Sequence, residues 1–191
     1  MFLLGLVLQV VIRRPHDRAR RQTRVATDRI GTAEKLVLSV LFLGVLLPGV
    51  YIFTPVLRFA DYGLPPGAAA WVGGAGGLLM GVALWLFWHA HADLGRNWSP
   101  SLQLMEHHSL VTGGIYRFVR HPMYASQWVF ALAQALLLQN WIAGPATLIC
   151  FAPLYFIRVP REEAMMLERF GETYRTYMVH TGRVLPRRSV G

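Results

Sequence analysis

Charged residues are scarce in this chain. They make up 15% of its 191 residues, whereas hydrophobic residues make up 54%. A soluble globular domain carries about 25% charged residues. Together with a mean hydropathy of +0.37, this deficit indicates that lipid is the main solvent of the protein. The length suits one domain rather than two, so we treat 1–191 as a single unit, with N-terminal spans in 1–92 and a functional part in 93–191.

Cysteine is almost absent as well, since Cys150 is the only one and lies in an apolar run. This excludes a disulfide framework or a thiolate metal site within one chain, and Cys150 is expected to be a small core residue. Histidines are present, but none follows a ligand spacing such as H-E-x-x-H. We therefore expect no metal; the histidines considered for one are His89, His91, His107 and His108.

The chain contains five apolar stretches. A helix needs about 20 apolar residues to cross the hydrocarbon core. Only Gln139 and Asn140 separate the last two stretches, which predicts a tight antiparallel hairpin. The first stretch is short and lacks the charged start and cleavage site of a signal peptide. The five stretches are Met1–Ile12, Leu36–Leu57, Trp71–Ala90, Met123–Leu138 and Trp141–Ile157.

Basic residues orient these spans. The net charge is +9, but the basic residues cluster between spans instead of forming a stripe, which argues against nucleic-acid binding. With the N-terminus outside, all of the 19 Lys and Arg residues except Arg58 lie on one side, the cytosolic side by the positive-inside rule. Arg161–Tyr177 has helical apolar spacing and is expected to form a cytosolic amphipathic helix. The Arg-, Ala- and Gly-rich composition is typical of a prokaryotic inner or plasma membrane protein.

Two polar segments stand out at the cytosolic ends of the predicted hairpin. One runs from Gln103 to Tyr124 and contains HHSLVTGGIYRFVRHPMY. The other is RVPREE, from Arg158 to Glu163. Ionisable groups at membrane depth are costly and usually functional. The hairpin should bring both segments together, because Tyr124 starts one span and Ile157 ends the next.

The motifs LGRNWSPSLQ, HSLVTGGIYRFVRHPMY and RVPREEAMMLERFGETYRTYMVHTGRVLP resemble the isoprenylcysteine carboxyl methyltransferase family. Related phospholipid N-methyltransferases share RHPxY and the paired glutamates. The resemblance covers about Asp93 to Pro186. It implies a membrane-embedded pocket for S-adenosylmethionine, unlike the Rossmann-like methyltransferases. In agreement, Gly113-Gly114 is preceded by no strand and is not a dinucleotide fingerprint.

The resemblance also implies which residues act. Arg158 matches a substrate-side arginine, and Glu162 matches an acidic cofactor contact. With Glu163 they form the expected catalytic set. The cofactor contacts that it implies are Gln103, His108, Ser109, Leu110, Val111, Tyr116, His121, Pro122, Met123, Tyr124 and Glu162.

Elementary chemistry agrees with these roles. A carboxylate such as Glu162 can pair with a cation in a low-dielectric site. Tyr116 and Tyr124 can offer aromatic faces to a sulfonium, and Arg120 with His121 can meet the carboxylate of the cofactor. The apolar side chains of Leu110 and Val111 can flank adenine.

Structural alternatives stay open for each residue. His121 could be a helix-entry residue satisfied by backbone. Glu162 and Glu163 could be ordinary first-turn acids of a helix that begins after Pro160. Arg158 could extend from the fifth span to the interface without any ligand.

The sequence thus predicts an all-α integral membrane protein with about five transmembrane helices, a tight C-terminal hairpin and a cytosolic amphipathic helix. Its expected function is methylation of a lipophilic small-molecule or prenylated acceptor, with S-adenosylhomocysteine as product. An acceptor carboxylate needs no base and could be held by Arg158. A phenolic lipid, small thiol or phospholipid amine would use a base, Glu163 or His121. A non-enzymatic membrane scaffold or transporter subunit is the alternative of another class.

Overall fold

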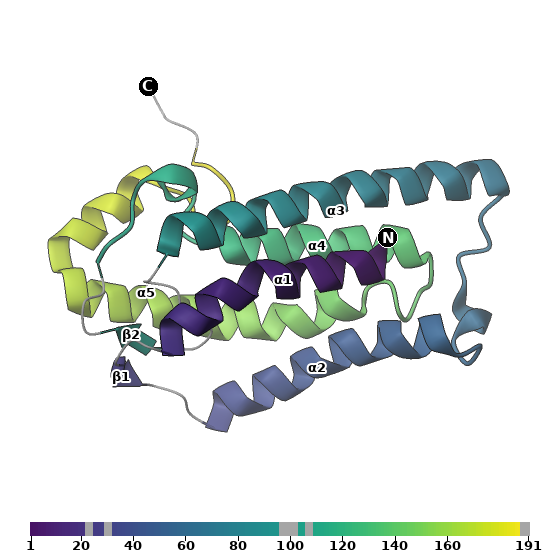
Figure 1. Ribbon diagram of the computed structural model, residues 1–191, viewed down its shortest axis with the longest axis horizontal. Coiled ribbons are helices and arrows are strands. Elements are labelled where there is room, and N and C mark those ends of the chain that lie inside the picture. Colours follow the sequence, from purple (N-terminus) through teal and green to yellow (C-terminus); the bar gives the residue numbers. More distant parts are fainter. Residues whose placement is uncertain (22–24, 29–31, 96–102, 106–108, 188–191) are drawn as a thin grey trace.

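The structure is a computed structural model that describes residues 1–21, 25–28, 32–95, 103–105 and 109–187. Five long helices run back and forth along its long axis (Figure 1). They are α1 (Phe2–Arg21), α2 (Thr32–Phe53), α3 (Pro66–Leu94), α4 (Pro122–Leu138) and α5 (Ala146–His180). The alternation of direction agrees with the order of the predicted spans.

Short elements lie at the two ends of this bundle. Strands β1 (Val25–Asp28) and β2 (Gln103–Met105) pair antiparallel, with Val25 opposite Met105. Single 3-10 turns, Arg58–Ala60 and Gly114–Arg117, precede α3 and α4. The bundle end that holds Arg58 is called the outer end below, and the end that holds β1 and β2 is called the inner end.

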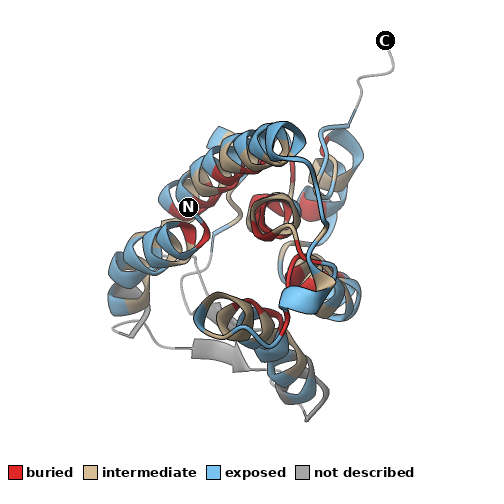
Figure 2. Cartoon of the chain, turned by 90° about the vertical axis from the view of Figure 1, so that its right-hand side faces the viewer, coloured by how far each residue is buried: buried red, intermediate tan, exposed pale blue. Residues whose placement is uncertain are grey.

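Apolar side chains cover the outside of the bundle. Figure 2 shows buried residues on the helix sides that face inward and exposed residues on the outer sides. On α3, Trp71 is 84% and Leu78 is 77% exposed. Among the described helices, α3 alone has the length and hydropathy to cross a membrane, and α2 holds a shorter apolar stretch, Leu38–Phe53. The count of five spans therefore stays a prediction.

Small residues let the helices approach closely. Helix α4 packs between α3 and α5, and α2 packs on α5. Ala83, Ala131 and Ala133 are fully buried. A Cβ added at Gly76 of α3 would lie 3.0 Å from the Leu136 Cβ of α4, so a larger residue would push the two helices apart.

The predicted two-residue hairpin is wrong, because α4 ends at Leu138 and α5 begins only at Ala146. Gln139 adopts a left-handed conformation (φ 48°). The Asn140 side-chain oxygen then accepts the backbone N–H groups of Ile142 at 3.0 Å and Ala143 at 2.9 Å. The apolar residues after Asn140, which were predicted to belong to the span, therefore form a turn before α5 begins.

The first part of the predicted amphipathic segment is not a separate helix either. Helix α5 continues through Pro153 and Pro160, and its φ/ψ angles leave the helical region only at Gly171 (φ 54°, ψ −126°). Glu162 and Glu163 therefore lie in the middle of α5. The alternative that they are first-turn acids after Pro160 is wrong. Up to Gly171 the predicted amphipathic segment continues the helix of the predicted span, and α5 is kinked at Gly171 before residues 172–180. Both acids lie before this kink, on the same helix as the span.

Candidate active site

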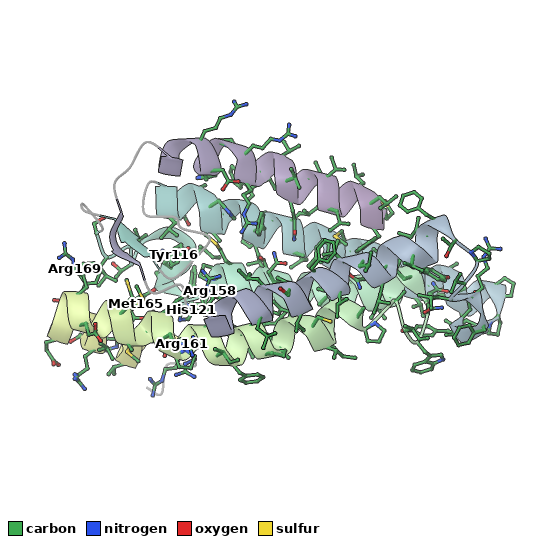
Figure 3. All side chains as sticks on the ribbon, turned by 90° about the horizontal axis from the view of Figure 1, so that it is seen from below. Tyr116, His121, Arg158, Arg161, Met165 and Arg169 are labelled. Atoms are coloured by element: carbon green, nitrogen blue, oxygen red, sulfur yellow. The ribbon has the colours of Figure 1, made fainter. Side chains whose placement is uncertain are left out.

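The site lies at the inner end, where the start of α4 meets the middle of α5. His121 is the residue before the first turn of α4, and Pro122 occupies the first turn, a position where its missing N–H is not needed. Figure 3 shows His121 and Arg158 close together, while Arg161 is exposed on the outside of α5. The bundle thus joins the two polar segments that the sequence singled out.

Glu162 is the centre of the first ionic group. Its Oε1 accepts the Tyr124 hydroxyl at 2.6 Å and the Arg158 Nε–H at 2.9 Å. Its Oε2 lies 3.7 Å from His121 Nδ1, beyond a normal hydrogen bond. The Glu162 side chain is 26% exposed, whereas its neighbours Arg158 and His121 are buried.

Glu163 is the centre of a second, closed group. Its Oε1 accepts Arg120 Nε at 3.1 Å and Arg120 Nη2 at 3.0 Å, and it lies 3.3 Å from His121 Nε2. Its Oε2 accepts Arg183 Nη2 at 2.7 Å and Arg183 Nε at 3.1 Å. Burial opposes ionisation, but the hydrogen bonds from His121, Arg183 and Arg120 outweigh it and lower the pKa of Glu163 to about 2.

The contact of Arg120 with a cofactor carboxylate stays a prediction, and the described contacts of Arg120 are within the protein. Besides Glu163, it donates to the backbone oxygens of Met178, at 3.1 Å, and Thr181. Its guanidinium therefore ties the residues before α4 to the end of α5. His121 likewise has Glu163 as a side-chain partner, so the alternative that backbone groups satisfy its ring is not what the structure shows.

Tyr116 links the site to α3. Its hydroxyl donates to the Ala90 backbone oxygen at 3.2 Å, and burial raises the pKa of Tyr116 well above its usual range. The backbone oxygen of Tyr116 accepts the Tyr177 hydroxyl at 2.6 Å. Asp93 accepts the Ile115 N–H at 2.7 Å, which fixes the same turn.

Sequence reasoning missed the strap, which we define as residues Thr181–Arg183. The strap runs beside the start of α4, where Arg120 N donates to Gly182 O at 2.8 Å and His121 N donates to Arg183 O at 2.9 Å. The available signal was that GRVLP belongs to the stretch that resembles the family.

The structure thus brings Tyr124, Arg158, Glu162, Glu163 and His121 together. Pro122 and Met123 form the first turn of α4, and Gln103 lies in β2. Ser109, Leu110 and Val111 lie in the irregular segment before Gly113. His108 lies outside the described residues. The cofactor contacts expected of these residues stay predictions.

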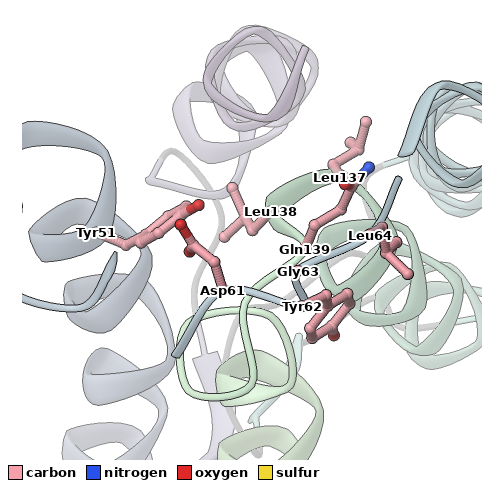
Figure 4. Close-up of a pocket in the computed structure, with 8 residues that line it drawn as sticks. All are labelled: Tyr51, Asp61, Tyr62, Gly63, Leu64, Leu137, Leu138 and Gln139. Atoms are coloured by element: carbon pink, nitrogen blue, oxygen red, sulfur yellow. The ribbon is translucent and has the colours of Figure 1, made fainter. Parts of the chain in front are cut away.

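A hollow of about 450 Å³ lies far from these groups, at the outer end. Figure 4 shows the Tyr51 and Asp61 side chains next to each other in its lining. The Asp61 carboxylate accepts the Asn140 side chain at 2.9 Å, which anchors the loop before α3 to the connection after α4. The hollow contains no cation–acid group like that of the inner end, among the residues that line it. We therefore place the chemistry at the inner end.

The bundle has the fold of an intramembrane methyltransferase. It resembles the solved structure of the eukaryotic intramembrane Ras methyltransferase ICMT (isoprenylcysteine carboxyl methyltransferase), with a TM-score of 0.57 and 24% identity. The match covers 82% of this chain and 54% of that chain. The predicted helical fold is confirmed to this extent, whereas the five transmembrane spans stay a prediction.

The family resemblance is confirmed by the sequence comparisons. Residues 77–168 match the model of the isoprenylcysteine carboxyl methyltransferase (ICMT) family. The chain is 36% identical over 70 residues to a protein-S-isoprenylcysteine O-methyltransferase of Schizosaccharomyces pombe, a match to 37% of this chain and 30% of the relative. It is 31% identical over 85 residues to protein-S-isoprenylcysteine O-methyltransferase A of Arabidopsis thaliana, or 44% and 43% of the two chains.

These matches span less than half the length of the curated relatives. The residues that the family model matches include the end of α3, all of α4 and α5 as far as Glu168. They include both Glu162 and Glu163, but they stop before the strap. The relatives named above are eukaryotic, so a prokaryotic origin stays a prediction.

Proposed function

We propose that this protein is an integral membrane methyltransferase that uses S-adenosylmethionine to methylate the carboxylate of a lipophilic, prenylcysteine-like acceptor. The observation that carries the proposal is the accessible Glu162 carboxylate, held between Arg158 of α5 and Tyr124 of α4. The names of the relatives, protein-S-isoprenylcysteine O-methyltransferase, support the same reaction.

The residues at the inner end fit the cofactor. Glu162 Oε1 accepts two hydrogen bonds, and Oε2 lies 3.7 Å from His121 Nδ1. The Tyr124 ring lies beside the His121 ring, with centroids 5.7 Å apart. A carboxylate beside an aromatic ring suits a ligand that carries a sulfonium and an ammonium group. Glu162 and Tyr124 would hold these cations. When bound, S-adenosylmethionine supplies an electrophilic methyl group on its sulfonium.

The state of Glu163 favours an acceptor that is already an anion. With its pKa lowered to about 2 and cations on both oxygens, Glu163 is too weak a base to deprotonate a phenol, thiol or amine. A carboxylate is ionised at neutral pH without a base. The Arg158 guanidinium would orient it as a planar, permanently charged partner. The protein then contributes mainly alignment and exclusion of water.

The charge pattern supports a cytosolic site. Arg58 is at the outer end, whereas the site and the basic tail of α5 are at the inner end. The positive-inside rule places the basic end in the cytosol. A cysteine introduced at Phe59, which is 80% exposed, in a Cys150→Ala background should react with an impermeant thiol reagent added outside intact cells. Reaction only after the cells are opened would overturn this orientation.

Ligand binding tests the cofactor assignment. A ligand at 100 times its dissociation constant stabilises a protein by about 2.7 kcal/mol, so S-adenosylhomocysteine should raise the melting temperature of the detergent-purified protein. Glu162→Gln keeps the size of the side chain but removes its charge, and it should weaken this shift. Glu172→Gln is the matched control, because Glu172 is 80% exposed on the same helix. No shift in the wild type would point instead to a non-enzymatic membrane protein.

A further inference from the structure

We propose that Arg183 is a positioning residue of the methyl-transfer site: it holds His121 by its backbone and, through Glu163, by its ring. This inference rests on the proposed function for its kinetic consequence, but the contacts that carry it are independent of any ligand. They connect the strap to the start of α4, two segments about sixty residues apart in the sequence.

The backbone contact comes first. His121 N donates to Arg183 O at 2.9 Å, next to the bond from Arg120 N to Gly182 O, and Val119 forms a parallel bridge with Gly182. His121 has φ −126° and ψ 61°, outside the helical region. The strap thus fixes the chain immediately before α4 begins, and with it the direction in which the imidazole leaves the backbone.

The side-chain contact completes the hold. The Arg183 guanidinium binds Glu163 through Nη2 at 2.7 Å and Nε at 3.1 Å, and Glu163 Oε1 lies 3.3 Å from His121 Nε2. An ionised carboxylate only accepts hydrogen bonds, so Nε2 carries a proton in this contact. The Nδ1 edge therefore faces Glu162, at 3.7 Å, on the side where the cofactor is proposed to bind.

Arg183 differs from Arg120, which holds the same carboxylate. The Arg120 side chain is 8% exposed and also supports the Met178 and Thr181 carbonyl groups, so its loss should damage the fold. Arg183 is 49% exposed, and half-exposed ion pairs contribute little to stability. Without Arg183, Glu163 keeps Arg120 and His121 as partners. Removal of Arg183 should loosen the ring without unfolding the protein.

The test compares Arg183→Gln, Arg183→Lys and Arg187→Gln in the full-length protein in nanodiscs. Arg187 is the control, because it is exposed and donates only to the Val179 and Met178 carbonyl oxygens in its described contacts. Nitrogen-15 NMR of the histidine rings, with His121→Asn for assignment, reports the tautomer. Methyl transfer to S-farnesyl-N-acetylcysteine gives kcat and KM, and thermal unfolding reports the fold.

Arg183→Gln should mix the His121 tautomers and lower kcat roughly tenfold to hundredfold, as small misplacements do, with a melting temperature like that of Arg187→Gln. Arg183→Lys keeps the charge and should recover part of both. Wild-type ring signals and kcat in Arg183→Gln, or a failure of this variant to fold, would overturn the proposal. If the wild type transfers no methyl group, the proposed function fails, and the ring spectra alone decide the role of Arg183.

Discussion

At the two ends of the bundle, the helices are connected by different kinds of polar side chain. At the outer end, Asn140 and Gln134 are fully buried, and they bind mainly backbone groups: Asn140 contacts Leu57, Ile142 and Ala143, and Gln134 contacts Ala143 and Gly144. At the inner end, charged side chains bind one another. Neutral amides join the outer ends of the helices, with Asp61 as one charged partner of Asn140, whereas ion pairs join the inner ends.

The difference separates structure from function. Buried neutral amides are satisfied locally and need no ligand. Buried ions are expensive to place away from water, so uncharged groups would stabilise the inner end at least as well. Glu162 remains 26% exposed next to buried partners, which a purely structural ion pair does not require. The contrast leads to the account in which the inner end binds a charged ligand.

The largest expected effect is at Glu163. Glu163→Gln leaves Arg120 and Arg183 without their carboxylate, and breaking a buried ion pair in this way costs about 3–5 kcal/mol. Denaturant unfolding in mild detergent measures the loss. Glu172→Gln, whose carboxylate pairs with Arg175 at 3.2 Å on the surface, should change the stability little. Equal small losses in the two variants would remove the distinction between the ends.

Acid should act on the inner end in the same way. The pKa of Glu163 is lowered from 4.5 to about 2, so this carboxylate contributes fully above about pH 4.5 and loses its contribution as the pH falls towards 2. A difference of 4.5 − 2 = 2.5 pKa units corresponds to about 3 kcal/mol. Unfolding free energies of the wild type should fall over this window more steeply than those of Glu163→Gln. Parallel profiles would contradict the assigned pairing.

A smaller effect is expected at the outer end. Asn140→Ala leaves the Leu57 oxygen and the N–H groups of Ile142 and Ala143 without their partner, at a cost of about 2–3 kcal/mol. Gln139→Ala removes one bond, to Ala69 at 2.8 Å, and should cost about 1 kcal/mol. Neither should change S-adenosylhomocysteine affinity, measured by calorimetry. A lower S-adenosylhomocysteine affinity in Asn140→Ala would show that the two ends are coupled, and it would contradict their separation.

Much of this arrangement is readable from the sequence because it depends on long apolar stretches and on motifs of fixed spacing. The stretches from Leu36, Trp71 and Met123 correspond to α2, α3 and α4 within a few residues. The meeting of the RHPxY and EE motifs follows from the antiparallel course of α4 and α5. These features are local or follow from chain order, so neither required knowledge of the packing.

The predictions that failed depend on contacts that a sequence pattern does not show. The stretch after Trp141 is apolar but forms a turn, because the Asn140 side chain competes for its backbone N–H groups. A new helix was expected to begin after Pro160, yet Pro160 lies inside α5. The role of Arg183 depends on contacts with Glu163 and His121, which no periodicity or spacing encodes.

The most direct test of the account is methyl transfer by the purified protein in nanodiscs, from methyl-labelled S-adenosylmethionine to S-farnesyl-N-acetylcysteine. A methyl ester releases labelled methanol in alkali, whereas N- and S-methyl products do not. The account predicts alkali-labile label with the wild type, little with Glu162→Gln, and strongly reduced label with Arg158→Lys at unchanged cofactor affinity. Alkali-stable label, or equal labelling by wild type and Glu162→Gln, would contradict it.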